Sequence, residues 1–266
     1  MKEEALSLAR AAVGPAQKLN ILREYVQAMT LRSFHESEAF AHLAFVGGTA
    51  LRFVYKLQRF SEDLDFSLHR ADGYVPRKWL KKVKRDLTLM GFDASVSFKD
   101  SATVHKGWIR VAGIMHETGL APMRNQKLSI KIEIDTRPPP GAETQRTVVS
   151  RHGILAIQHY TLSSLMAGKI HALLTRAYPK GRDWYDLVWY RGLRPPPEPN
   201  LVLLQNACDQ SLGRGQCEAA CWKETLKTAL AGMDVRSLRE DVYPFLERQD
   251  EARLLDLENL AAILRE

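Results

Sequence analysis

FVGGTALR at residues 45–52 and RFSEDLDF at residues 59–66 are the two stretches that decide the fold. The first is an apolar run that ends in Gly47-Gly48, which predicts a buried strand that enters a tight turn. Thr49 can cap a short helix over residues 50–55. Because a glycine pair lets backbone N–H groups approach a ligand and a helix N-terminus is positive, the turn is typical of a phosphate cradle.

The second stretch continues into residues 63–68, which alternate apolar and polar side chains. This period of two predicts a half-buried strand, with the carboxylates of Asp63 and Asp65 projecting from one face. Two carboxylates that converge in this way suit a hard divalent cation, Mg²⁺ or Mn²⁺. A simple glycine turn and a solvated acidic strand are the alternatives for each feature by itself. Their order and spacing favour a phosphate cradle beside a metal site.

A third carboxylate is expected on the strand predicted over residues 127–135, since a two-metal phosphoryl-transfer site needs a further ligand. Glu133 and Asp135 share one face of this strand. Glu133 is central in the strand and Asp135 is at its end, so we favour Glu133 and keep Asp135 as the alternative. An ordinary charged strand residue is the competing interpretation for both.

The remaining pattern predicts an α+β protein with a mixed or antiparallel sheet flanked by helices, followed by an all-helical C-terminal domain. Further strands are expected over residues 92–99 and 106–115, and a helix is expected from Pro76. Helical periodicity extends over 3–38, with a break near Gly14-Pro15, and over 161–176, 182–192, 200–212, 216–231, 236–248 and 250–265. We therefore expect a helical lead-in at 1–38, an α+β domain at 39–155 and a helical domain at 156–266.

Composition agrees with a globular protein, because 45% of the 266 residues are apolar and 26% are charged. The formal charge of +7 favours an anionic partner. The chain has no apolar run of about 18 residues, so no membrane helix is expected. Residues 1–6 are acidic, unlike a signal peptide, and we expect a cytoplasmic protein without a membrane partner. Its three cysteines, which lack a zinc-ligand spacing, are expected to be free thiols.

A second motif reads KIHALLTR at residues 169–176 and RDWYDL at residues 182–187. Lys169 and Arg176 lie on one helix face with small Ala172 between them, which could hold a triphosphate as a point charge and a fork. Asp183 and Asp186 are three residues apart and point the same way. An exposed pair of salt-bridged helices is the competing interpretation.

The helix that begins at Pro76 is strongly basic. The residues best placed to bind a polyanionic acceptor are Lys81, Lys82, Lys84 and Arg85. Such binding would depend strongly on salt. A solvated basic face explains the same pattern equally well.

Both motifs resemble those of the AbiEii/AbiGii nucleotidyltransferases, which belong to the DNA-polymerase-beta-like superfamily and include many toxins of toxin–antitoxin pairs. The resemblance extends over residues 40–192 and implies that Asp63, Asp65, Lys169 and Asp183 are catalytic; the strand pattern adds Glu133 to this set. Asp63, Asp65 and Glu133 would hold the metal, and Asp186 is the alternative essential aspartate of the second motif. The nucleotide would be bound by Gly47, Gly48, Thr49, Arg59, Ser61, Lys169, Arg176 and Asp186. Gly168 departs from the family, which often has glutamate there, and a glycine weakens a helix by about 1 kcal/mol.

The expected activity is transfer of a nucleoside monophosphate from an NTP to an acceptor hydroxyl, with release of pyrophosphate. By resemblance the acceptor is RNA, most plausibly the 3′ end of tRNA, and an antitoxin from a neighbouring gene is a partner. Transfer to a small molecule, as in antibiotic-modifying nucleotidyltransferases, is the first alternative. A nucleotide- or RNA-binding module without turnover is the second.

Overall fold

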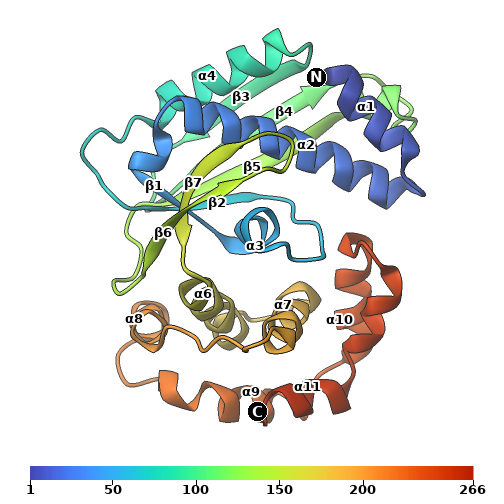
Figure 1. The fold of residues 1–266 in the computed structure, drawn as a ribbon. Helices are drawn as coiled ribbons and strands as arrows, with labels where there is room; N and C mark the ends of the chain where they lie inside the picture. The colour runs from blue at the N-terminus through green and yellow to red at the C-terminus, as the bar shows by residue number, and fades with distance from the viewer. Residues whose placement is uncertain (266) are drawn as a thin grey trace. The chain divides into compact units, whose positions relative to one another are not determined.

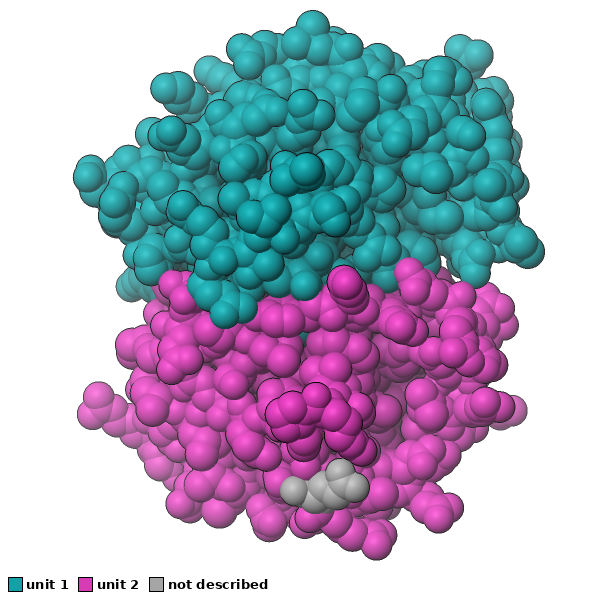
Figure 2. Space-filling view, viewed as in Figure 1, with its two compact units in different colours: residues 1–54, 60–137, 145–159 teal, residues 55–59, 138–144, 160–266 magenta. Residues whose placement is uncertain are grey.

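The chain divides into two compact units in the computed structural model, which describes residues 1–265 (Figure 2). Unit 1 contains residues 1–54, 60–137 and 145–159. Unit 2 contains residues 55–59, 138–144 and those from 160 onward. The chain therefore passes between the units five times, and neither unit is one continuous segment.

Unit 1 is built on a seven-stranded sheet with the order β3-β4-β5-β2-β1-β7-β6 (Figure 1). Its strands are β1 (Leu43–Val46), β2 (Leu64–Leu68), β3 (Asp93–Lys99), β4 (Val104–Ala112), β5 (Lys127–Asp135), β6 (Thr144–Val149) and β7 (Leu155–Tyr160). β2 runs antiparallel to β1 and parallel to β5, and β5 runs antiparallel to β4. The sheet is therefore mixed, which confirms the fold class expected from the sequence.

Helices flank this sheet: α1 (Lys2–Ala11), α2 (Pro15–Glu36), α3 (Gly47–Tyr55), α4 (Pro76–Leu89) and the short α5 (Ile114–Glu117). Aromatic rings join α2 to the sheet and to α4. The ring centroid of Phe34 in α2 is 5.4 Å from that of Phe66 in β2 and 6.2 Å from that of Trp79 in α4. Burial of these large apolar side chains is the main stabilising term for this layer.

The alternation of β2 determines which side chains leave the core. Phe66 is 2% exposed, and its ring stacks on that of Phe45, its register partner in β1, at 5.2 Å. Because successive side chains of a strand point to opposite faces, Asp65 projects from the face opposite Phe66. The apolar pattern of β2 thus positions the candidate carboxylate on the sheet face away from α2.

In unit 2, the described elements after β7 are helices: α6 (Leu162–Thr175), α7 (Gly181–Gly192), α8 (Leu201–Leu212), α9 (Trp222–Leu230), α10 (Val235–Val242) and α11 (Leu257–Ile263), with short 3₁₀ turns between them (Figure 1). Four begin with a side chain that accepts a hydrogen bond from the first turn: Thr161, Asn200, Asp234 and Asp256. Such caps satisfy backbone N–H groups that have no partner within the helix.

The structure corrects the sequence prediction at the start of α3 and at the end of the sheet. Helix α3 begins at Gly47, so Thr49 lies inside the helix and is not its N-cap. The strands β6 and β7 were not expected, although β7 alternates buried and half-exposed residues over 155–158. The helix α6 continues through Gly168 without a break. Other interactions of the unit therefore offset the loss of helix stability that a glycine causes.

No helix among residues 1–265 combines the length and the hydropathy that a membrane crossing requires.

Candidate functional site

The glycine turn and the aspartate strand interlock within unit 1. Gly47 has a φ of +77°, and a Cβ atom added there would lie 2.5 Å from Oδ2 of Asp65. The hydroxyl of buried Thr49 donates a hydrogen bond to the backbone carbonyl of Asp63. Only glycine fits a left-handed residue in contact with a carboxylate. The first motif therefore fixes the position of the Asp65 side chain, and the Thr49 hydroxyl is already used inside the fold.

The loop before Asp63 is held by a residue that the sequence analysis missed. Gln27 of α2 is 1% exposed, and its Nε2 donates to the carbonyls of Ser61 at 3.0 Å and Glu62 at 2.8 Å. Ser61, predicted to bind nucleotide, thus contributes its backbone to this clamp. The sequence pattern that could have identified Gln27 is a polar residue in a stretch of α2 that is otherwise largely apolar. An amide in such a stretch is buried and therefore needs hydrogen-bond partners.

Two of the three predicted carboxylates are register partners. Asp65 of β2 pairs with Glu133 of β5, and these strands are parallel neighbours, so both side chains lie on the same face. Asp63 directly precedes β2. Asp135 pairs with Ser67 instead, and its Oδ1 accepts a hydrogen bond from the backbone N–H of Arg137 at 2.9 Å. The sheet therefore brings Glu133, rather than Asp135, beside Asp65.

Glu133 also has basic neighbours. Its Oε1 lies 2.8 Å from Nζ of Lys131 and 3.9 Å from Nζ of Lys106. Burial would lower the pKa of the Lys131 ammonium group, but its hydrogen bond with Glu133 and the charges of Asp63 and Asp65 raise it. The carboxylates thus create a negative field that already attracts one cation.

These carboxylates are better suited to an ion such as Mg²⁺, which keeps part of its water shell, than to a metal held entirely by protein ligands. Among residues 1–265, no three His, Cys, Asp or Glu side chains are grouped tightly enough to form a ready-made site. Mg²⁺ keeps several waters and uses one or two carboxylates together with substrate phosphates. Asp65 and Glu133, with Asp63 at the start of β2, supply oxygen ligands of that kind.

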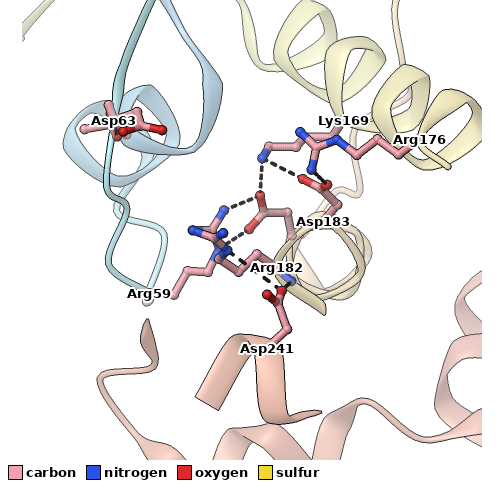
Figure 3. A network of polar contacts seen from close by, with 9 residues as sticks. Arg59, Asp63, Lys169, Arg176, Arg182, Asp183 and Asp241 are labelled. Carbon is pink, nitrogen blue, oxygen red and sulfur yellow. Dashed lines mark hydrogen bonds and ion pairs between the residues drawn. The ribbon is translucent and has the colours of Figure 1, made fainter. Parts of the chain in front are cut away.

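The second motif forms a buried ion network in unit 2 (Figure 3). Nζ of Lys169 lies 3.1 Å from Oδ1 of Asp183 and 2.8 Å from Oδ2 of Asp186. Arg176 pairs with Oδ2 of Asp183. Arg59 forks onto both oxygens of Asp186, with two distances of 2.6 Å. Three cations thus share two carboxylates.

Burial differs strongly across this network. The side chains of Arg59 and Asp186 are 2% and 0% exposed, whereas that of Arg176 is 42% exposed. Burial would raise the pKa of the Asp183 carboxyl, but Lys169 and Arg176 hold it below its usual value. Arg59 and Asp186 therefore form a structural pair as placed, and Arg176 is the cation most open to an anionic ligand.

The basic helix α4 uses part of its charge internally. Nζ of Lys82 lies 2.9 Å from Glu36 and also pairs with Asp86, and Arg85 lies 3.4 Å from Asp86. Lys81 and Lys84 are exposed and form no ion pair in the part of the chain that the structure describes. Half of the four predicted RNA-binding residues are therefore already paired.

Comparison with known proteins gives one family and two solved structures. The family model "Nucleotidyl transferase AbiEii toxin, Type IV TA system" matches residues 30–262. The crystal structure of JHP933 from Helicobacter pylori has a TM-score of 0.53 and 20% identity, covering 92% of this chain and 88% of that chain. A second H. pylori structure, provisionally described as a nucleotidyltransferase, has a TM-score of 0.55 and 20% identity, covering 91% and 89%. At this identity the likeness shows a shared fold. No curated protein matches the chain.

Proposed function

The chain belongs to the AbiEii family of nucleotidyltransferase toxins, and on that premise we propose that it transfers a nucleoside monophosphate from an NTP to the 3′ end of an RNA, with tRNA as the favoured acceptor. Family membership makes it a nucleotidyltransferase of a type IV toxin–antitoxin system, with a nucleotide substrate and an antitoxin partner. The acceptor, the metal and the residue roles below are the proposal.

The observation that carries the proposal is the arrangement around Gly47. The carboxylate of Asp65 lies against this glycine, where a Cβ atom would collide, and Glu133 stands beside Asp65 on the next strand. Carboxylates placed at a glycine turn and a helix N-terminus can bring a cation and a phosphate together. A divalent cation held by Asp63 and Asp65, with Glu133, would neutralise phosphate charge and favour ionisation of the acceptor hydroxyl.

The chain's own residues supply positioning. The backbone of Gly47 and Gly48 would bind the phosphates at the start of α3. In unit 2, Lys169 and Arg176 would offer phosphate groups a point charge and a fork. Asp183 would orient both cations, since it pairs with each of them. Asp186 and Arg59 would support Lys169 from the interior of the same unit.

The acceptor is proposed to be RNA because α4 carries exposed Lys81, Lys84 and Arg85 in the same unit as the carboxylates. Phosphate contacts of this kind provide affinity that falls with salt. Modification of RNA would stop growth, and an antitoxin would relieve the arrest.

Labelling of cellular RNA tests this function. Purified protein is incubated with Mg²⁺, total cellular RNA and each α-labelled NTP in turn. We expect label on RNA with at least one NTP, and a loss of about 10²–10³-fold for Asp65→Asn because a fixed electrostatic contact is removed. Asp72→Asn, in an exposed turn of the same unit, is the matched control and should keep the activity.

Two results would overturn the proposal. A folded protein that labels no RNA with any NTP excludes the RNA acceptor, and labelling of a small-molecule acceptor would then identify the alternative. Growth arrest by Asp65→Asn equal to that of the unchanged chain excludes catalysis as the cause of toxicity and indicates a binding module.

A further inference from the structure

Unit 1 contains a pocket of about 680 Å³ at the N-terminal half of α4, here called the α4 pocket. It is lined by residues from the end of α2, by His42 before β1, by Gly73 and Val75 in the loop after β2, and by α4. Val46, at the opposite end of β1, pairs with Asp65. Val46 is four residue steps along the chain from His42, which is about 13 Å in extended chain. The pocket is therefore distinct from the carboxylates.

The floor of the α4 pocket is an aromatic pair. The His42 ring stacks on the Trp79 ring at a centroid distance of 5.9 Å and an angle of 28°. Gly73 has a φ of +77°, and a Cβ atom there would lie 2.5 Å from Cε1 of His42, so the loop backbone rests on the imidazole. Nδ1 of His42 is buried and has no hydrogen-bond partner within residues 1–265.

One wall of the α4 pocket is cationic. Lys78 and Lys81 are exposed, lie three residues apart on one face of α4, and form no ion pair in the described part of the chain. Lys78 is in the first turn of α4, which contains no acidic residue, and Arg77 beside it already pairs with Asp100 at 2.7 Å. Cations at the positive end of a helix destabilise it. An anion bound at this wall would offset that cost.

The other wall supplies acceptors. Glu38, which has a left-handed φ of 58°, is exposed, and Glu36, two residues before it, already pairs with Lys82. A simple polyanion would be repelled by Glu38, whereas a ligand with both a phosphate and donor groups would satisfy both walls. The volume is within the range of about 300–1,000 Å³ that is typical of small-ligand pockets. A nucleotide has this combination of phosphate, ring and hydroxyl or amine donors.

We propose that the α4 pocket is a second nucleotide site, which holds one nucleotide unit of the acceptor RNA away from the reacting 3′ end. Its phosphate lies against Lys78 and Lys81, and sugar or base donors face Glu38. The assignment to acceptor RNA rests on the proposed function. An acidic protein segment fits less well, because it brings like charge to Glu38 and offers few donors.

A binding measurement without NTP tests the pocket separately from catalysis. A fluorescein-labelled oligoribonucleotide is titrated with the full chain, and anisotropy is followed at several salt concentrations. Lys78→Gln with Lys81→Gln should weaken binding at least about tenfold and reduce the slope of log K against log salt by roughly 0.7, the contribution of one single-strand phosphate contact, because both lysines face the same phosphate. Arg124→Gln with Lys127→Gln is the matched control, because both residues are exposed in unit 1 outside the pocket and should leave affinity and slope unchanged.

An uncharged change gives a second test. Gly73→Ala should displace the His42 ring and weaken RNA binding without removing a charge, so affinity should fall while the salt slope stays the same. If Lys78→Gln/Lys81→Gln and the control pair have the same RNA affinity and the same salt slope, the proposal that the α4 pocket binds RNA is overturned.

Two further measurements are needed. One distinguishes a nucleotide unit of RNA from a free nucleotide, and the other distinguishes the pocket proposal from the proposed transfer activity. AMP should compete with the labelled RNA for the pocket; AMP binding that RNA does not displace would overturn the RNA assignment. In transfer assays, the double variant Lys78→Gln/Lys81→Gln should have a higher KM for RNA and an unchanged KM for NTP. A chain that binds RNA through Lys78 and Lys81 but labels none supports the pocket and overturns only the proposed activity.

Discussion

At the scale of single residues, the candidate site depends on a contact between a glycine and a carboxylate. Asp65 occupies the space that a side chain at Gly47 would need. Thr49 and Gln27 add hydrogen bonds to the backbone on either side of Asp63. These contacts position the carboxylates without involving any ligand, so the geometry of the site is built into the fold.

Gly47→Ala is the substitution that tests this contact. The new methyl group would push the Asp65 carboxylate away, and the left-handed backbone would add strain of about 1–3 kcal/mol. We expect transfer activity to fall at least about tenfold, with a lower free energy of unfolding.

Gly119→Ala is the matched control for Gly47→Ala. Gly119 has a φ of +73° in the same unit, and a Cβ atom there would meet nothing within 4 Å. It should destabilise to a similar extent and keep its activity. Urea unfolding and transfer kinetics of both variants check this, and an equal loss of activity in the two would contradict the role of the Gly47 contact.

At the scale of elements, ion pairs join segments that are distant in sequence. In unit 2, Arg59 joins the segment 55–59 to α7 through Asp186. In unit 1, Glu24 of α2 pairs with Arg52 of α3 and lies 2.8 Å from Nε of Arg151, in the turn between β6 and β7. Both sets are buried, so loss of one partner leaves an uncompensated charge.

Arg59→Met should destabilise the protein by about 3–5 kcal/mol, because Asp186 would keep a buried charge with only Lys169 beside it. Arg248→Ala removes a cation from an exposed pair with Asp250 and should cost at most about 1 kcal/mol. Urea denaturation measures both. A loss for Arg59→Met no larger than that for Arg248→Ala would show that the buried pair contributes little.

Glu24 predicts a pH dependence of stability. Burial would raise the pKa of its carboxyl, but hydrogen bonds and charges from His152, Arg52 and Arg151 lower it from 4.5 to about 2. A pKa that is lower in the folded state stabilises above pH 4.5, and the contribution is lost as the pH falls toward 2.

We expect Glu24→Gln to lower the free energy of unfolding by about 3 kcal/mol at pH 6. The difference from the unchanged protein should shrink between pH 4.5 and pH 2. Unfolding curves at pH 6, 4 and 3 measure it, with exposed Glu3→Gln as the control. A difference that stays constant over this range would contradict the assignment.

Much of the local structure followed from sequence, because one pattern dominated each segment. The alternation in residues 127–135 predicted β5 with its observed bounds, and the helix from Pro76 is α4. The strand β6 was missed because it is an edge strand rich in exposed polar residues. Predicted helices over 236–248 and 250–265 are interrupted by 3₁₀ turns, which periodicity does not distinguish from α-helix.

The site was predictable by residue type but not by partner. Asp65 and Glu133 were expected to be on strands, yet only the sheet order makes those strands neighbours. Lys131 was visible as a strand residue, but its contact with Glu133 depends on side-chain direction. Arg59 was expected at the nucleotide, whereas its guanidinium is buried against Asp186. Long-range pairing of this kind leaves no periodic signal in the sequence. The roles of these residues in catalysis remain predictions.

At the scale of the whole molecule, the organisation is interleaved. Unit 2 takes residues 55–59 from between two segments of unit 1, and Leu57 in that short segment is 1% exposed. Residues 138–144 are inserted in the same way, and the carbonyl of Gly141 accepts a hydrogen bond from Asn200 at 2.8 Å. Each unit is therefore completed by pieces of chain that come from between the segments of the other.

A fragment that starts at residue 160 should fold poorly, because it lacks Leu57 and the partner of Asp186. The missing ion pair by itself costs about 3–5 kcal/mol, which is a large part of the usual stability of 5–15 kcal/mol. We expect a broad thermal transition by circular dichroism. Fusing residues 55–59 and 138–144 to the fragment through flexible linkers should sharpen it. A fragment as cooperative as the fusion would show that the inserted segments are dispensable.

The shared volume of Gly47 and Asp65 also has a consequence for descent. Two positions that compete for the same space are inherited as a pair, because a side chain at the first excludes the carboxylate at the second. A relative that lost the aspartate would no longer need glycine at the first position, and a residue with a side chain could then replace it. Among relatives, a residue larger than glycine at the position of Gly47 should therefore identify proteins that have lost activity, even where the rest of the motif is retained.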